Sequence, residues 1–380
     1  MHTIKVRSGV VLFVSALIPL IFFLIFDFFW GSYFPITSKH LSDDKKPYLQ
    51  LNNGWYELKS NFIGKDQYGP NIFPVMTNDY GFRKGPNSPN GGKHEFIFLG
   101  DSFTYGINGA WNETFVGIFE AQSGKMVLNA GVSSYSPSAY LFQYKKALKN
   151  GALSAKHTVI VALDISDVQD EAAFWTWDQQ NSMHPIKIGS HQSNEKSNQL
   201  TSQGLRKKFY NNFPLTSGMY KFVRYEFFAN SSPPLLAETL SQARSSFTWQ
   251  DWSLLDQNRP RDTPGSYAPL GVEKGLIKIE DALREIVNLA NQSSSNVYFL
   301  IYPWPAQIVY QDKFNWSKWV QYQCLKLDCA GVVDTIPYFR RISKDTNWYY
   351  DFYLIGDSHF NERGNQIIAS QLLEAVISKK

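Results

Sequence analysis

The sequence contains very little cysteine: Cys324 and Cys329 are the only two among 380 residues, with four residues between them. A structural zinc site needs four ligands, and no histidine lies near this pair, so we expect no metal centre here. In an oxidising compartment the two thiols would close a small disulfide loop, and two unpaired buried thiols are the alternative.

An excess of one charge is also absent. Lys and Arg number 37 against 33 Asp and Glu, giving a formal net charge of +4, and the basic residues form no dense block. This pattern gives no electrostatic case for a nucleic-acid partner. Charged residues make up 18% of the chain and hydrophobic residues 43%, which excludes a disordered chain.

Long hydrophobic runs are missing, with one exception. The mean hydropathy of −0.30 excludes a polytopic membrane protein. Residues 10–26 carry no charge, however, and with their flanks they match a bilayer core about 30 Å thick. Because Lys5 and Arg7 precede this run, we expect a transmembrane helix within residues 8–30 and a cytoplasmic N-terminus. A cleaved signal peptide is the alternative, although no small-residue cleavage site follows. Both interpretations place the remaining chain outside the cytoplasm, in the periplasm if the source is bacterial.

The rest of the sequence alternates between short apolar runs and helix-like segments. Strands are expected at residues 95–99, 125–129, 158–163, 297–302 and 331–333, and helices at 113–122, 137–149, 272–291, 315–325 and 361–379. This spacing predicts right-handed crossovers and an α/β fold, in which helices cover both faces of a mostly parallel sheet in three α/β/α layers.

The composition also suggests how the chain is divided. We expect a cytoplasmic tip and anchor at residues 1–31, a stalk and lead-in at 32–77, and one folded domain at 78–380. A stretch rich in Gln, Asn, Ser and aromatic residues, at about 171–265, interrupts the alternation and is interpreted as an insertion, either a lid or a substrate-facing subdomain.

Chemistry in an open parallel sheet gathers beyond the carboxyl ends of the strands. Ser102 follows the first predicted strand at a helix start, where its own amide lacks a helical partner and could donate to an oxyanion. Gly131 offers a second amide after the next strand. Near the C-terminus, Asp357 and His359 are two residues apart and share a face if their loop is extended. Simpler interpretations exist: a helix cap for Ser102, a tight turn for Gly131 and a surface position for His359.

In this order, the motifs resemble those of the SGNH (GDSL-type) family of serine esterases and acyltransferases. The resemblance covers roughly residues 78–170 and 268–378, and leaves out the predicted anchor, stalk and insertion. The matching blocks are Gly100-Asp101-Ser102 with Gly106, Asn129-Ala130-Gly131, and Asp357-Ser358-His359 with Gly364. The G-x-S-x-G elbow of the other common serine-hydrolase fold is absent.

The resemblance implies a role for each of these residues. Ser102 would be the nucleophile, His359 its general base and Asp357 the group that orients the imidazole. The amides of Ser102 and Gly131 would hold the oxyanion, and neither a metal nor a cofactor is required.

One block departs from the family pattern. Where members carry Gly-x-Asn-Asp, this chain has Asp164-Ile165-Ser166-Asp167, so Ser166 stands at the position of the Asn that completes the oxyanion hole. A hydroxyl reaches less far than an amide. Either Ser166 or Gln169 replaces the missing donor, or the enzyme is slow on simple esters.

The resemblance also indicates the chemistry. Extracytoplasmic members add or remove acetyl groups on envelope polysaccharides, so we expect a membrane-anchored ester hydrolase or O-acetyltransferase acting on acylated carbohydrate, with a membrane acyl-donor protein as a further partner. Asp101 and Trp304 are candidate substrate-binding residues. Aromatic faces in the insertion could stack on sugar rings, with core packing as the alternative, at Trp175, Trp177, Trp249 and Trp252.

Two other functions remain open from the sequence. The altered third block would suit a degenerate member that serves as a carbohydrate-binding or scaffold protein. A lipase or phospholipase would need a strongly apolar face on the insertion, for which residues 219–228 are the candidate stretch.

Overall fold

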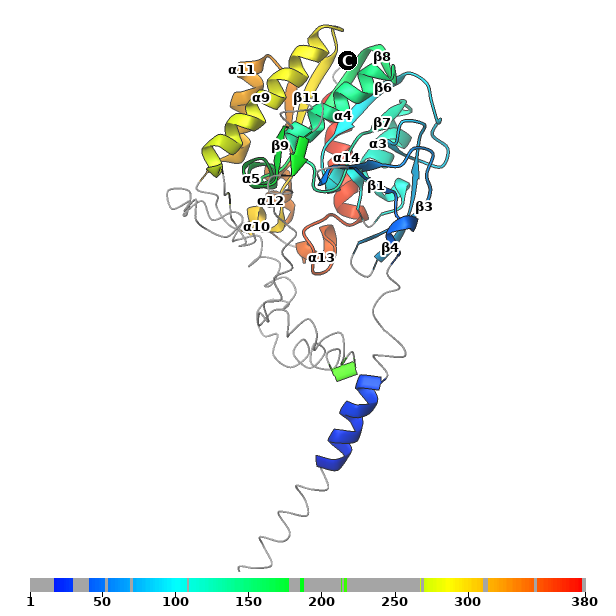
Figure 1. Cartoon of the computed structure of the whole chain (residues 1–380). Coiled ribbons are helices and arrows are strands. Elements are labelled where there is room, and N and C mark those ends of the chain that lie inside the picture. The colour runs from blue at the N-terminus through cyan, green and yellow to red at the C-terminus, as the bar shows by residue number, and fades with distance from the viewer. Residues whose placement is uncertain are drawn as a thin grey trace, which may run out of the picture. The chain divides into compact units, whose positions relative to one another are not determined.

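The computed structural model describes residues 17–29, 41–51, 54–68, 71–107, 109–177, 185–187, 213, 215–216, 267, 270–309, 314–344 and 347–377 (Figure 1). The chain divides into two compact units. One comprises Met1–Leu41, Gly69–Asn71 and Glu195–Pro234, and the other comprises Ser42–Tyr68, Ile72–Asn194 and Leu235–Lys380. The second unit carries the sheet and the predicted motifs.

In the first unit, residues 17–29 are helical. Asp27, which ends the apolar run, is fully buried, and its carboxylate accepts hydrogen bonds from the amides of Leu215 and Thr216 at 2.8 and 2.7 Å. Within the described ranges, no helix has both the length and the apolar character needed to cross a membrane. The remainder of the predicted anchor, residues 8–16 and 30, lies outside those ranges.

The second unit is built on an eight-stranded sheet in the order β12-β11-β8-β6-β7-β5-β4-β3. Five neighbouring strands are parallel: β12 (Gly331–Asp334), β11 (Asn296–Ile301), β8 (Leu153–Leu163), β6 (His94–Leu99) and β7 (Val127–Asn129). On the far side of β7, the strand β5 (Arg83–Lys84) runs antiparallel both to β7 and to β4 (Asn71–Thr77), and β3 (Ile63–Tyr68) forms the edge. The prediction of a mostly parallel sheet is therefore confirmed.

Alternate side chains of the central strands enter two separate buried layers. Ile97 and Leu99 of β6 belong to one core, whereas Phe96 and Phe98 belong to the other. Because successive side chains of a strand point to opposite faces, a strand covered on both sides needs this continuous apolar run. The first core is closed by α4 (Pro137–Lys149) and α9 (Gly271–Asn291), and the second by α3 (Phe115–Ser123) and α14 (Glu362–Val376) (Figure 1). The three-layer prediction is confirmed.

Several helices begin at the side chains that the sequence offers for the purpose. Thr114 accepts a hydrogen bond from the Gly117 amide at the start of α3, and Asn361 accepts one from the Gly364 amide at the start of α14. Asn315 does the same for α11 (Trp316–Leu327). The remaining helices are η1 (Asp43–Lys45), α2 (Ser102–Tyr105), η3 (Trp111–Glu113), α5 (Ser166–Ala173), α10 (Pro305–Val309), α12 (Ile336–Ile342) and α13 (Trp348–Phe352).

Much of the segment predicted as a stalk and lead-in, residues 32–77, consists of strands. Residues 48–77 form β1 (Tyr48–Gln50), β2 (Tyr56–Leu58), β3 and β4, and the last two extend the main sheet. The sequence did not predict β3, because most side chains of this strand are exposed or half-buried and only Asp66 is fully buried. No apolar run therefore marks the strand in the sequence. A strand at the edge of a sheet, wetted on one side, leaves a weak pattern in the sequence.

The structure describes the first part of the predicted insertion at residues 171–265. Residue 171, where the insertion was expected to begin, lies inside α5, and an antiparallel hairpin of β9 (Trp175–Trp177) and β10 (Pro185–Lys187) follows it. Most of residues 188–265, including the stretch 219–228, lies outside the described ranges.

Cys324 and Cys329 form a disulfide at the C-terminal end of α11, so the first of the two alternatives left open by the sequence is the one observed.

Candidate active site

The short helix α2 carries Ser102 at its first position, directly after β6. The chain leaves β6 for β7 on one side, whereas β8 lies on the other side of β6, so Ser102 stands where the strand order reverses. Such switch points are where open α/β sheets bind ligands. The carboxylate of Asp101 accepts the Phe103 amide at 2.9 Å, and Gly106, at a φ of 83°, ends the helix after one turn.

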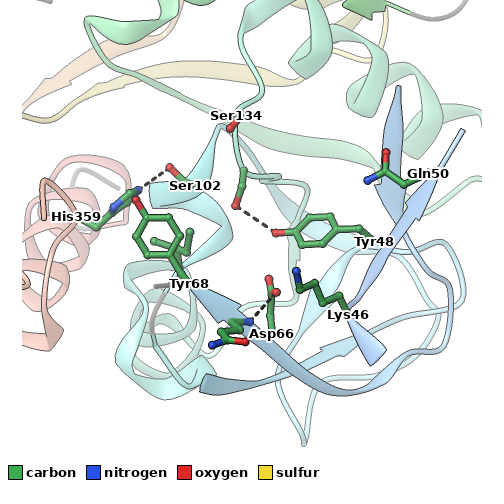
Figure 2. Close-up of a pocket in the computed structure, with 11 residues that line it drawn as sticks. Lys46, Tyr48, Gln50, Asp66, Tyr68, Ser102, Ser134 and His359 are labelled. Atoms are coloured by element: carbon green, nitrogen blue, oxygen red, sulfur yellow. Dashed lines mark hydrogen bonds between the residues drawn. The ribbon is translucent and has the colours of Figure 1, made fainter. Parts of the chain in front are cut away.

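Ser102, His359 and Asp357 form a continuous hydrogen-bonded chain. The Oγ of Ser102 lies 2.7 Å from Nε2 of His359 (Figure 2). On the other side of the ring, Nδ1 of His359 lies 2.6 Å from Oδ1 of Asp357. The same carboxylate oxygen accepts the His359 amide at 3.0 Å. If Nδ1 carries its proton towards Asp357, Nε2 is left to accept the Ser102 hydroxyl proton, which is the arrangement of a general base.

The ionisation of Asp357 suits this arrangement. Burial raises the pKa of its carboxyl, but the hydrogen bond and charge of His359, with the amides of His359 and Ser358, outweigh burial and hold the pKa below its ordinary value. Asp357 is therefore a carboxylate at neutral pH. It can fix the imidazole tautomer and stabilise the imidazolium that forms when His359 takes a proton.

Aromatic rings hold the imidazole in place. The ring of His359 lies 4.6 Å from that of Phe103 and 5.3 Å from that of Tyr68, measured between centroids. Burial and the nearby charge of Asp357 raise the pKa of Tyr68 to about 12, so its phenol stays neutral. Tyr349 fixes the loop that carries Asp357 and His359, because its hydroxyl is hydrogen-bonded to the backbone of Asp357.

A pocket of about 450 Å³ opens over Ser102 and His359 (Figure 2). This volume is within the range of small-molecule sites. Much of its wall comes from the segment that was predicted to be a stalk and lead-in, and every lining residue except Ile107 carries a polar side-chain atom. The other lining residues are Lys46, Tyr48, Gln50, Asp66, Gln67, Tyr68, Ile107, Ser133 and Ser134.

The polar wall is anchored by Asp66. This carboxylate is only 3% exposed, and it accepts the Tyr105 hydroxyl and the Gln67 amide, each at 2.8 Å. The Tyr48 hydroxyl donates to Oγ of Ser133 at 3.3 Å. Burial, with the charge of Asp66, raises the pKa of Tyr48, so its hydroxyl remains a donor at any working pH.

The turn that contains Ser133 and Ser134 lines the pocket. Its carbonyls are occupied: the Tyr56 hydroxyl donates to Ser133 O at 2.5 Å, and the Trp175 indole donates to Ser134 O at 2.9 Å. Ser134 has a φ of 61°, a left-handed conformation that is strained for a serine and recurs at functional sites. Within the described part of the chain, the amides of both serines, like that of Ser102, donate to no acceptor.

Gly131 and Ser166, the other residues predicted for the oxyanion hole, already have hydrogen-bond partners within the protein. The Gly131 amide already donates to Oδ1 of Asn129 at 2.9 Å, and a Cβ at Gly131 would lie 2.5 Å from the Tyr105 nitrogen. Gly131 is therefore explained by its close approach to α2. The amide and hydroxyl of Ser166 both donate to Oδ1 of Asp164, at 2.7 and 2.6 Å. Neither residue lines the pocket, and neither does Gln169.

The two predicted substrate-binding residues also face the protein. Asp101 is 6% exposed and accepts the Tyr302 hydroxyl at 2.9 Å. The Trp304 indole donates to Oδ2 of Asp164 at 2.8 Å. Neither lines the pocket. Trp175 is buried against Trp55, in agreement with the core-packing alternative, whereas the Trp177 side chain, Trp249 and Trp252 lie outside what the structure describes.

Arg83 is a residue that the sequence analysis missed. It is 1% exposed, and its guanidinium donates to three carbonyls of the segment after the nucleophile: Tyr105 at 2.5 Å, Gly106 at 2.7 Å and Gly109 at 2.6 Å. It also lies over the Tyr105 ring, 5.0 Å from the centroid. This one side chain ties β5 to the end of α2.

Comparison with known proteins gives a distant likeness only. No family model and no curated protein matches the sequence. Among solved structures, the chain is similar to the acetyl xylan esterase AlAXEase, with 11% identity and a TM-score of 0.38 over 74% of this chain and 99% of the other.

Two further structures match at a similar level. The chain is similar to LAE5, an alpha/beta hydrolase enzyme from the metagenome of Lake Arreo, with 12% identity and a TM-score of 0.36 over 75% of this chain and 95% of that one. It is also similar to a catalytic mutant of Axe2, an acetylxylan esterase from Geobacillus stearothermophilus, with 11% identity and a TM-score of 0.36 over 75% and 94%. Similarity at this level establishes neither a common family nor a common activity.

Proposed function

We propose that this chain is a serine-dependent ester hydrolase or O-acyltransferase that acts on short O-acyl groups carried by carbohydrate. The observation that carries the proposal is the contact between Ser102 and His359, 2.7 Å apart although 257 residues separate them, with the Asp357 carboxylate on the other ring nitrogen. A hydroxyl, an imidazole and a carboxylate in this order form the constellation of acyl-transfer catalysis.

The mechanism follows from the geometry. Ser102 Oγ attacks the ester carbonyl and its proton passes to Nε2 of His359, which gives a tetrahedral oxyanion and an imidazolium. The intermediate collapses, the ester C–O bond breaks, and the departing alcohol takes the proton from Nε2, leaving an acyl-serine. Water or a second hydroxyl then attacks the acyl-serine by the same steps, and Ser102 recovers its proton.

The oxyanion hole is proposed to use the Ser102 amide and the Ser133–Ser134 turn. These amides have no other acceptor in the described part of the chain, and the turn lines the same pocket as Ser102. The Ser133 hydroxyl accepts from Tyr48, so its own proton is available to a substrate oxygen. Preorganised donors of this kind contribute on the order of 10²–10³ in rate each.

The pocket lining supports a polar alcohol and a short acyl group. Among the described residues that line the pocket, Ile107 is the only aliphatic one. A long acyl chain would meet mainly polar side chains in this pocket, such as Asp66, Gln50 and Gln67. A sugar offers them hydroxyl groups and offers Tyr48 and Tyr68 a flat face. The lipase alternative is therefore disfavoured.

The first experiment tests the nucleophile. Full-length protein and Ser102→Ala should be compared for release of acetate from p-nitrophenyl acetate and from a peracetylated monosaccharide. We expect Ser102→Ala to lose activity by about 10³-fold or more, and a fluorophosphonate probe to label wild-type protein at Ser102 alone. The control is Ser370→Ala, which removes an exposed hydroxyl from α14 and should change nothing.

This experiment also separates the proposal from a degenerate scaffold. Equal rates of acetate release for wild type and Ser102→Ala, together with no fluorophosphonate labelling of Ser102, would contradict the enzyme hypothesis. Supplying an acetyl donor with an oligosaccharide acceptor then distinguishes the two reactions, because transfer gives acetylated oligosaccharide by mass spectrometry and hydrolysis gives only free acetate.

We further propose that the folded unit works outside the cytoplasm. The disulfide between Cys324 and Cys329 supports this placement, because such bonds persist in oxidising compartments and are rare in the cytosol.

A further inference from the structure

The turn proposed for the oxyanion hole is held by two side chains that the proposed mechanism does not use. The Tyr56 hydroxyl, from β2, donates to the Ser133 carbonyl at 2.5 Å. The Trp175 indole, from β9, donates to the Ser134 carbonyl at 2.9 Å. Neither Tyr56 nor Trp175 lines the pocket, so an effect of either residue on the reaction must pass through the turn.

These two hydrogen bonds fall on the two peptide groups that flank Ser134. The Ser133 carbonyl and the Ser134 amide belong to one planar peptide group, and the Ser134 carbonyl belongs to the next. The φ and ψ angles of Ser134 describe how these two planes are turned about its Cα. Fixing one carbonyl in each plane therefore holds Ser134 at its φ of 61°, a left-handed conformation that serine seldom adopts without support.

The contact with Tyr56 also sets the direction of the Ser134 amide. In a trans peptide the carbonyl and the N–H point in opposite directions, so the Ser134 N–H points away from the Tyr56 hydroxyl. A donor on the carbonyl also polarises the peptide group and strengthens its N–H as a donor. Burial raises the pKa of the Tyr56 phenol, which therefore keeps its proton at any working pH.

Both donors are anchored in turn. The Tyr135 hydroxyl, directly after the turn, donates to the Tyr56 carbonyl, so β2 and this segment hold each other in both directions. Trp175 is 1% exposed, and its carbonyl accepts a hydrogen bond from the Lys278 ammonium. The same ammonium pairs with the buried Glu171 carboxylate at 2.8 Å. These contacts fix the positions from which Tyr56 and Trp175 reach the turn.

We propose that Tyr56 and Trp175 are positioning residues that clamp Ser134 in its left-handed conformation, so that the Ser134 amide is aligned for the oxyanion. This clamp rests on the proposed function. Both residues lie outside residues 78–170 and 268–378, the segments that resemble the SGNH family. The added segments thus support an oxyanion hole in a chain that has Ser166 where the family has its Asn.

The clamp is tested in full-length protein with p-nitrophenyl acetate. Tyr56→Phe and Trp175→Phe each remove one hydrogen-bond donor and retain an aromatic ring. We expect each to lower kcat by about tenfold, because an unsupported serine seldom stays left-handed. KM should stay within about twofold, because the oxyanion forms only in the transition state. The inhibition constant of a trifluoromethyl ketone, which forms a tetrahedral adduct with serine, should rise as kcat falls.

Two combinations of substitutions separate the clamp from simple packing. Because the release of either peptide plane is enough to free Ser134, the double variant should be about as slow as each single variant, rather than about a hundredfold slower than wild type. Ser134→Gly should shrink the effect of Tyr56→Phe from about tenfold to about twofold, because glycine adopts a positive φ at no steric cost.

Trp55→Phe and Tyr144→Phe are the matched controls. The Trp55 ring is 2% exposed and lies 5.6 Å from that of Trp175, in the same aromatic cluster, but its indole donates to Glu57 at 3.2 Å. The Tyr144 hydroxyl is hydrogen-bonded to Nε2 of His157 at 2.8 Å. Neither substitution removes a donor from the turn, so both variants should keep the wild-type kcat.

The outcomes are distinguishable. Wild-type kcat in both Tyr56→Phe and Trp175→Phe, in a protein that is labelled at Ser102, would refute the clamp and leave the proposed function standing. An equal loss in Trp55→Phe would assign the effect to aromatic packing and would also refute the clamp. If thermal unfolding shows that one clamp variant does not fold, the other variant, alone and combined with Ser134→Gly, decides. Wild-type protein with neither esterase activity nor labelling at Ser102 would overturn the proposed function, and with it the clamp.

Discussion

At the scale of single residues, the candidate site depends on which lone pairs and protons are already engaged. Asn129 is an example, because its side chain accepts the Gly131 amide and donates to the Thr104 carbonyl, and so engages the Gly131 amide while bracing α2. The Ser133–Ser134 turn differs, since donors from Tyr56 and Trp175 engage its carbonyls, whereas its amides donate to no acceptor in the described part of the chain.

The first residue-scale prediction concerns Asp357. We expect Asp357→Asn to lower kcat by about 10⁴-fold, because an amide at this position favours the tautomer of His359 that cannot accept the Ser102 proton. The pKa of Asp357 is lowered in the folded protein, so its ionised form contributes stability above the ordinary carboxyl pKa and loses it as pH falls through the folded value.

The defect of Asp357→Asn should therefore extend across the neutral range, which steady-state kinetics from pH 6 to 8 would check. The control is Asp281→Asn, which removes an exposed carboxylate from the surface of α9. A loss confined to one end of that range would show that Asp357 acts through something other than the imidazole.

The sequence could predict only those parts of the site that stand in short, local motifs. Ser102, Asp357 and His359 stand in short motifs at element boundaries, and the structure brings these three together. The engagement of Gly131 by Asn129 and of Ser166 by Asp164 depends on side-chain geometry that no spacing reveals. Arg83 gave no signal, because an isolated arginine in a short strand looks like a surface residue.

At the scale of elements, the N-terminal strands turn out to be part of the site. β6, β8 and β11 were predictable because strands covered on both faces need continuous apolar runs. β1 and β3 have exposed faces and were missed, although they supply Tyr48, Gln50 and Asp66 to the pocket.

The element-scale prediction tests β1 as a wall for the alcohol part of the substrate. We expect Gln50→Ala to raise KM for a peracetylated monosaccharide by about threefold to tenfold, the loss of one hydrogen bond, with kcat retained. Hydrolysis of p-nitrophenyl acetate, whose alcohol has no sugar hydroxyls, should be unchanged. Gln366→Ala, on the exposed face of α14, is the matched control. An equal effect on both substrates would mean that β1 supports the catalytic residues rather than the sugar.

At the scale of the whole molecule, the disulfide bears on where the protein works. We expect a thiol-reactive label to miss Cys324 and Cys329 in protein unfolded without reductant, and to modify both after reduction, as mass spectrometry would detect. Because the bridge closes a small loop, its loss should cost about 2 kcal/mol of unfolding free energy. Quantitative labelling before reduction would remove the support for a site outside the cytoplasm.

The way in which the pocket is assembled has a consequence for biosynthesis. Its lining comes from both extremes of the folded unit: Lys46 and Tyr48 enter early, Ser102 follows, and His359 arrives almost last. A nascent chain therefore remains inactive in the proposed reaction until His359 has been synthesised, since any shorter chain lacks half of the proposed machinery. Reactivity towards a covalent inhibitor would thus serve as a reporter of completed folding, and it should appear after the central strands have already become protected from hydrogen exchange.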